Sequence, residues 1–133
     1  MGLTTRTTIS EVHTPSQTDF DRFARVSGDD NPIHVDPAFV ARTRFGRTVA
    51  HGMFLSSILW SVIRRHLPQT GRQLTQELKF PSPAFAGEGL RFVVTVQHRS
   101  ASRVALAFSV TRDSDGTVTC EGNSEFEIRS ECS

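Results

Sequence analysis

The sequence lacks the features that mark disulfide-rich, exported and membrane-spanning proteins. It has two cysteines, Cys120 and Cys132, which make neither a disulfide framework nor a metal-ligand cluster, and we expect neither thiol to be catalytic. No uncharged apolar run approaches the roughly 20 residues that span a bilayer. Residues 1–11 are polar and lack the apolar segment of an export signal. We therefore expect a cytoplasmic protein without a membrane partner.

The sequence also lacks a strong net charge and the length for two domains. Its formal charge is +1, and arginine and acidic residues are spread evenly, so nothing predicts binding to nucleic acid. A chain of 133 residues with 37% hydrophobic residues can bury one core but hardly two. Because no repeat or linker divides it, we expect one domain over residues 1–133.

Helices are predicted in the first half of the chain. One is expected to begin at Thr14 as N-cap, with Pro15 at the first helical position, and to end at Gly28. Residues 38–49 can hold one irregular helix. Residues 52–67 are apolar over most of the circumference of a helix, so we expect this helix to lie inside the domain.

After Pro68 the apolar residues recur with a period of two, which is typical of half-buried strands. Besides an extended stretch at 7–12, strands are predicted over residues 74–80, 90–96, 104–110 and 118–128. The short joins at Ser100-Ala101 and Asp115-Gly116 favour an antiparallel meander. The fold class is therefore α+β, with a sheet wrapped over a central helix.

Residues suited to proton transfer occur together at one place, directly before the apolar helix. Asp29 and His34 flank an Asn31-Pro32 turn, which folds the backbone so that both side chains can face one water molecule. A neutral imidazole there can serve as a general base. Spacing alone favours a plainer interpretation, in which Asp, Asn and Pro build a turn and the histidine caps a helix.

Gly52 marks the start of the apolar helix, where backbone N–H groups have no partner within the helix. A glycine would let a substrate approach the backbone closely, and its N–H could stabilise negative charge on a carbonyl oxygen. Considered alone, a glycine that begins a helix in a tight space explains the residue equally well.

Together these residues resemble the signature of the MaoC-like, (R)-specific enoyl-CoA hydratases. The resemblance is carried by Gly28 to Pro37, Ala41, Phe45, Val49 to Met53, and Phe80 to Leu90.

The resemblance implies a hot-dog fold, an antiparallel sheet around a long central helix, in a homodimer that binds acyl-CoA. It implies that Asp29 and His34 hold and activate water, and that the Gly52 amide polarises a thioester carbonyl. The implied reaction is the reversible hydration of a trans-2-enoyl thioester to the (R)-3-hydroxyacyl thioester, with no metal and no cofactor. The resemblance leaves open whether coenzyme A or acyl carrier protein carries the acyl group, and which of the two residues moves each proton.

Neighbouring residues receive supporting roles. We expect Asn31 to hold the turn or orient Asp29, His51 to support the oxyanion turn, and Asp36 to cap the next short helix.

Three arginines, Arg42, Arg44 and Arg47, follow the motif closely. They are candidates to meet the phosphates of coenzyme A, although a solvated basic face is the commoner explanation.

Two other functions share the implied fold and the acyl-thioester ligand. A hot-dog thioesterase would direct water at the carbonyl carbon, but the complete Asp29 to His34 motif argues against it. A non-catalytic acyl-thioester binding subunit would not need an intact catalytic pair. A domain with no thioester site is the weakest interpretation.

Overall fold

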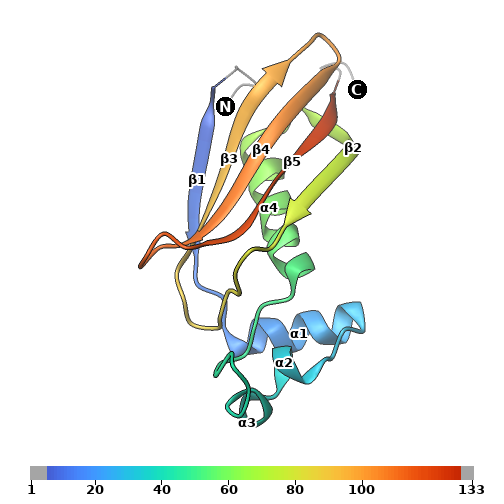
Figure 1. Ribbon diagram of the computed structural model, residues 1–133. Helices are drawn as coiled ribbons and strands as arrows, with labels where there is room; N and C mark the ends of the chain where they lie inside the picture. The colour runs from blue at the N-terminus through green and yellow to red at the C-terminus, as the bar shows by residue number, and fades with distance from the viewer. Residues whose placement is uncertain (1–5, 130–133) are drawn as a thin grey trace.

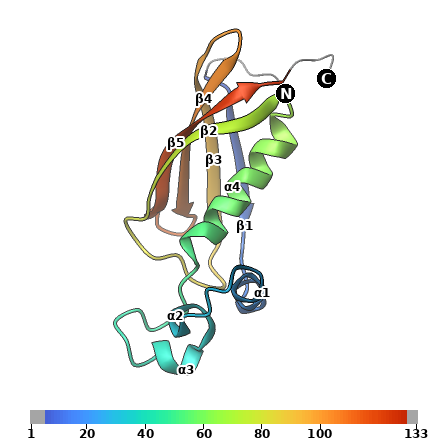
Figure 2. The ribbon, with the colours of Figure 1, turned by 90° about the vertical axis from the view of Figure 1, so that its right-hand side faces the viewer.

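Residues 6–129 are described by the computed structural model, in which a sheet covers a long helix (Figure 1). The strands are β1 (Thr8–His13), β2 (Thr70–Lys79), β3 (Leu90–Arg99), β4 (Arg103–Arg112) and β5 (Val118–Ile128). The helices are α1 (Gln17–Ser27), α2 (Pro32–Val35), α3 (Pro37–Val40) and α4 (Gly52–His66). Helix α4 runs along one face of the sheet, whereas α1, α2 and α3 gather beyond its end (Figure 2). This arrangement is the α+β architecture that the sequence predicts.

All paired strands are antiparallel, and the order across the sheet is β1-β3-β4-β5-β2. Strands β3, β4 and β5 form the predicted meander. The meander is wrong for β2, which pairs with β5 and not with β3. The reason is the connection over residues 80–89, which is longer than a hairpin turn and contains Pro81 and Pro83, whose nitrogens cannot donate to a strand ladder.

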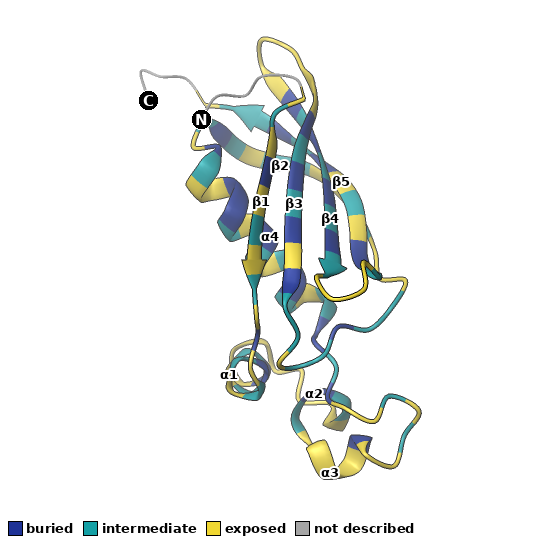
Figure 3. Cartoon of the chain, turned by 90° about the vertical axis from the view of Figure 1, so that its left-hand side faces the viewer, coloured by how far each residue is buried: buried dark blue, intermediate teal, exposed yellow. Residues whose placement is uncertain are grey.

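The core lies between α4 and the facing side of the sheet. Buried residues alternate with more exposed ones along β3 and β4 (Figure 3), as the period-two pattern predicts. Helix α4 contributes Leu55, Leu59, Val62 and Ile63, whose spacing places them on one stripe. Burying each such side chain stabilises the fold by roughly 1.5–3 kcal/mol relative to leaving it in water.

Helix α4 is not buried on all sides, which corrects the expectation from its composition. Met53 is 59% exposed and Trp60 is 38% exposed, because a single sheet can cover only one face of the helix. The opposite face of α4 is therefore an open apolar surface in the single chain.

Helix α1 begins two residues later than predicted. Its N-cap is Ser16 and not Thr14, because Ser16 and Asp19 form a capping box in which each side chain bonds the backbone N–H of the other. The predicted end is confirmed. Gly28 closes the helix in the left-handed conformation, with φ of 80°, which suits glycine.

The single irregular helix expected over residues 38–49 is replaced by two one-turn helices that begin earlier, α2 and α3. Each has a proline at its start, where the missing N–H costs nothing. Asp36 caps α3 as expected, its carboxylate accepting from the Phe39 N–H at 3.1 Å.

Two further findings bear on the sequence predictions. Among residues 6–129, no helix combines the length and apolar character that crossing a bilayer requires.

Burial raises the pKa of the Cys120 thiol to about 11, which agrees with the expectation that this thiol is not catalytic. Cys132 lies outside the described residues.

Candidate active site

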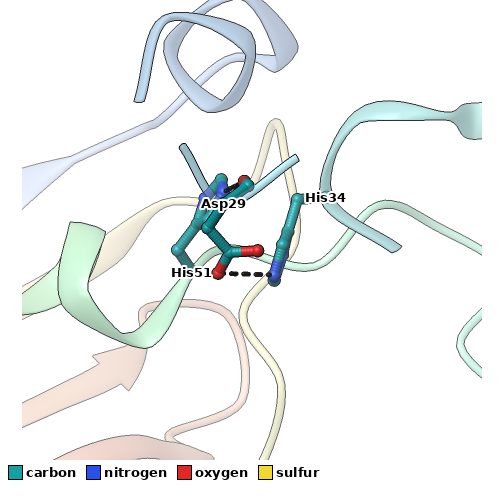
Figure 4. A group of neighbouring side chains, drawn as sticks. All are labelled: Asp29, His34 and His51. Carbon is teal, nitrogen blue, oxygen red and sulfur yellow. Dashed lines mark hydrogen bonds and ion pairs between the residues drawn. The ribbon is translucent and has the colours of Figure 1, made fainter. Parts of the chain in front are cut away.

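The structure brings Asp29 and His34 together beside the start of α4 (Figure 4). The Oδ2 atom of Asp29 lies 3.8 Å from Nε2 of His34, and the side chains are 55% and 10% exposed respectively. A buried imidazole therefore faces a carboxylate that is open to solvent. The gap between them is too long for a hydrogen bond but suits one bridging water molecule.

The turn between the two residues is fixed by hydrogen bonds within it. The Asn31 side chain accepts from the Ile33 N–H at 3.1 Å and so caps α2. The Asn31 N–H donates to Oδ1 of Asp29 at 3.5 Å, leaving Oδ2 on the side of His34. Asn31 thus caps α2 with its side chain, and its backbone N–H contacts the carboxylate of Asp29.

His34 is held from its other side by the segment that leads into α4. Its Nδ1 lies 2.6 Å from the Val49 carbonyl oxygen, and the Val49 N–H donates in return to the Ile33 carbonyl at 2.8 Å. Because a carbonyl only accepts, Nδ1 carries the proton. The lone pair of Nε2 is then left facing Asp29.

His51 contacts both members of the pair and is 2% exposed. Its ring stacks on that of His34 with centroids 3.8 Å apart and an interplanar angle of 23°. Its Nε2–H donates to the Asp29 carbonyl at 2.8 Å, and Nδ1 is buried without a partner among the described residues. Burial lowers the pKa of His51 below its ordinary value; the nearby His34 acts in the same direction, and the bond to the Asp29 carbonyl opposes it. His51 is thus a neutral platform under the pair.

Gly52 directly follows His51 and opens α4, whose N-terminus has no side-chain cap. Free N–H groups at this end carry the positive pole of the helix. A Cβ at this position would lie 2.9 Å from Cζ of Phe80, so the absence of a side chain leaves room for that ring. The amide is thus beside the pair and near an aromatic wall.

A cleft of about 410 Å³ has Gly52 in its wall. It runs between the segment before α4 and the connection that follows β2. Its walls are Arg44, Phe45, Val49, Ala50, Gly52, Leu55, Phe80, Pro81, Ser82, Pro83, Ala84 and Thr119. A cleft of this size suits a small-molecule ligand.

Sequence reasoning missed Gln17, at the start of α1. Its Nε2 donates to the His34 carbonyl at 2.9 Å, and its Oε1 accepts from the Thr48 hydroxyl at 2.5 Å. The Gln17 side chain therefore links α1 to the two segments that hold the His34 ring. Its distance in sequence from the motif hid this role, and only a glutamine on the inner side of the first helical turn hinted at it.

The three neighbouring side chains could also contact a metal ion, since ligand atoms of Asp29, His34 and His51 lie within 4.8 Å of one another. Imidazoles that share a metal ion aim their lone pairs at one point, whereas these two rings are stacked. The arrangement fits a water molecule between carboxylate and imidazole better. That the reaction needs no metal or cofactor stays a prediction.

The chain is similar in sequence to known proteins. A family model described as MaoC like domain matches residues 3–116. The (R)-specific enoyl-CoA hydratase of Aeromonas caviae is 43% identical over 75 residues, a match that spans 56% of each chain. The enzyme of the same name from Rhodospirillum rubrum is 32% identical over 120 residues, covering 90% of this chain and 83% of the relative. The chain thus spans little more than half of the first of these relatives.

A solved structure of a relative matches the whole fold. The unliganded R-hydratase PhaJ1 from Pseudomonas aeruginosa superimposes with a TM-score of 0.89 at 30% identity, covering 96% of this chain and 83% of that one. The hot-dog fold that the sequence resemblance implies is therefore confirmed.

Proposed function

The chain belongs to the MaoC-like domain family, and from this premise we propose that it reversibly hydrates trans-2-enoyl thioesters to (R)-3-hydroxyacyl thioesters. The observation that carries the proposal is the 3.8 Å gap between Oδ2 of Asp29 and Nε2 of His34, beside the uncapped N-terminus of α4. The (R) configuration follows from the relatives, whose names specify it.

The Asp29 and His34 pair holds the attacking water. An oxygen placed about 2.8 Å from both Oδ2 and Nε2 can donate to each. The protonated Nδ1 of His34 leaves Nε2 free to accept a proton as the water oxygen attacks C3 of the enoyl group. His51 supports this step by fixing the Asp29 backbone and the plane of the His34 ring.

The Gly52 N–H binds the thioester oxygen. As water adds to C3, negative charge moves through C2 to this oxygen, and an amide at a helix N-terminus stabilises it. The negative charge that develops in the substrate is therefore located at the positive end of α4. This contact makes C3 electrophilic without a metal ion.

Two proton transfers complete the hydration. The water loses one proton to the Asp29 and His34 pair, and the pair returns one proton to C2, so the net change is addition of H2O. Because both groups lie on one side of the bound enoyl group, addition is syn.

We further propose that the active form is a cytoplasmic homodimer. Strand β2 is at the edge of the sheet, where its outer backbone groups can pair with another strand. The exposed Met53 and Trp60 of α4 lie next to it, lining one pocket together with Gln73 and Gln76 of β2. Light scattering on the purified protein is expected to give twice the chain mass, and Trp60→Glu is expected to give the monomer mass.

Loss of enoyl absorbance with crotonyl-CoA tests the reaction. Wild type should hydrate it, and Asp29→Asn and His34→Ala should each lower kcat by about 10²- to 10⁴-fold. The matched control is Asp30→Asn, since Asp30 is exposed beside Asp29 and is expected to keep near wild-type activity. A stereospecific dehydrogenase should identify the product as the (R)-alcohol.

Other outcomes point to the other functions. Release of free thiol without loss of the double bond would identify a thioesterase. Acyl-CoA binding with neither reaction, unchanged in Asp29→Asn, would identify a binding subunit.

A further inference from the structure

The arginines that follow the motif separate into three different environments. Arg47 donates to the Ala86 carbonyl at 2.6 Å, and one of its nitrogens lies 4.0 Å from Glu88, so it fastens the connection after β2. Arg42 is exposed and does not line the cleft. Of the three, only Arg44 lines the cleft that includes Gly52.

Arg44 is available for an anion. Its guanidinium lies 5.0 Å from the centroid of the Phe45 ring, which holds it against another wall residue. It has no carboxylate partner among residues 6–129, and it is the one charged residue of the cleft wall in that part of the chain. An anionic ligand would therefore meet one cation and no opposing acid.

The rest of the cleft suits a chain of amides and methylenes. Its wall is mostly apolar, with Phe80, Pro81 and Pro83 on one side. Ser82 adds a hydroxyl that makes no hydrogen bond within residues 6–129 and can serve a ligand amide. The wall also includes Gly52, to whose amide the proposed function assigns the thioester oxygen.

We infer that this cleft binds the phosphopantetheine arm of the substrate and that Arg44 pairs with its 4′-phosphate. The inference rests on the proposed function for the position of the thioester. Coenzyme A and acyl carrier protein both present this arm, so the residue recognises what the two carriers share. Arg44 therefore sets affinity for the carrier and takes no part in the chemistry.

Crotonyl thioesters that differ only in the carrier test the inference. Wild type, Arg44→Ala and Arg42→Ala are assayed with crotonyl-CoA, crotonyl-4′-phosphopantetheine and crotonyl-pantetheine, which lacks phosphate. Arg44→Ala should raise KM roughly 10- to 100-fold for the first two, as expected for one charge-assisted hydrogen bond, and leave kcat and the pantetheine KM unchanged. Arg42→Ala, the matched control, should change none of these values.

Three results would overturn the inference. These are an equal rise of KM with all three substrates, no rise with any, and a rise confined to coenzyme A, which would assign Arg44 to the nucleotide phosphates. Crotonyl-acyl carrier protein, measured in parallel, identifies the natural carrier by its wild-type kcat/KM. An Arg44 effect that also appears with crotonyl-4′-phosphopantetheine or with crotonyl-acyl carrier protein supports the inference.

Calorimetric binding separates this inference from the proposed function. Unacylated 4′-phosphopantetheine should bind wild type more tightly than pantetheine does, and Arg44→Ala should abolish the difference. If wild type hydrates no thioester but shows this Arg44-dependent difference, the reaction is wrong and the binding site stands. If hydration occurs and the difference is absent, the reaction stands and the inference fails.

Discussion

The core and the segment that carries the candidate site are held by different kinds of interaction. In the core, the buried hydroxyls of Thr70 and Thr119 bond carbonyls three residues away or on the neighbouring strand, and apolar side chains fill the remaining space. In residues 16–51, which we call the site segment, three bonds join parts of the chain 15, 22 and 31 residues apart. Two of the three depend on one side chain each, His34 and His51, and the third joins the side chains of Gln17 and Thr48.

Because of this difference, we expect the stability of the fold and the activity of the site to respond to different substitutions. Core stability is shared among many apolar contacts and ladder bonds, so we expect the largest loss where a substitution blocks the backbone itself. The geometry of the site depends on a few side-chain bonds, which can be lost while the sheet stays intact. Four substitutions, in order of decreasing effect on stability, test this separation.

The largest effect is expected from Gly122→Ala in β5. A Cβ there would lie 1.9 Å from the Glu77 carbonyl oxygen of β2, and backbone cannot move aside as a side chain can. We expect a loss of more than about 4 kcal/mol of unfolding free energy or no folded protein, measured by thermal unfolding followed by circular dichroism. The control is Gly116→Ala, where space is open and φ is 75°, at a cost of about 1–2 kcal/mol. Equal melting of both variants would contradict the prediction.

Gln17→Ala should affect the site more than the fold. It removes the bonds to the His34 carbonyl and the Thr48 hydroxyl, so the unfolding free energy should fall by about 1–2 kcal/mol. Because catalytic groups lose rate when displaced slightly, kcat with crotonyl-CoA should fall about 10-fold. Gln97→Ala serves as control, since Gln97 is exposed on β3 and belongs to neither the site segment nor the proposed dimer contact. An unchanged kcat in Gln17→Ala would show that the site does not need this bond.

His51→Phe should change how stability depends on pH. The pKa of His51 in the folded protein is lowered below its ordinary value of 6.5. The His51 imidazole therefore binds a proton more tightly in the unfolded chain than in the folded one. Its contribution to stability is therefore complete above pH 6.5 and is lost as the pH falls towards the folded pKa. Denaturant midpoints at pH 7 and pH 5 should differ less in His51→Phe than in wild type. The control is His98→Phe, on the exposed end of β3, in which the midpoints at pH 7 and pH 5 should differ as much as in wild type. If they differ as much in His51→Phe, then His51 is not the source of this pH dependence.

The smallest effect is expected from Glu11→Gln in β1. Its carboxylate binds His13, Arg65 and His66 and so ties β1 to the end of α4, far from the site. Burial acts to raise the pKa of Glu11, but its bonds to the two histidines and the arginine lower it below 4.5. The variant should lose about 0.5–1 kcal/mol at neutral pH with kcat unchanged, as chemical denaturation and the crotonyl-CoA assay would measure. A fall in kcat would show that the Glu11 contacts also influence the site segment, contrary to the prediction.

The sequence was sufficient for features that depend on nearby residues. The alternation over 90–96 and 104–110 predicted β3 and β4, and Gly28 predicted the end of α1, because side-chain period and local backbone conformation decide them. The Asp29 to His34 spacing likewise predicted a pair that the structure places 3.8 Å apart.

The remaining features depend on the path of the chain in space. The partner of β2 follows from where residues 80–89 lead, and the exposure of Trp60 follows from the sheet covering one side of α4. The stack of His51 on His34 joins residues 17 positions apart that no local pattern relates. Arg44 could not be separated from Arg42 and Arg47 until the cleft was visible.

The strand order also has a consequence for how the chain acquires its structure during synthesis. Strand β2 is complete at residue 79, but its one neighbour in the sheet, β5, begins only at residue 118. Until β5 has been synthesised, α4 has only part of the sheet to cover it, and the nascent chain exposes apolar surface on which chaperones act. Closure of the sheet therefore waits for synthesis of β5, and premature termination before residue 118 would release a chain in which β2 has no partner strand.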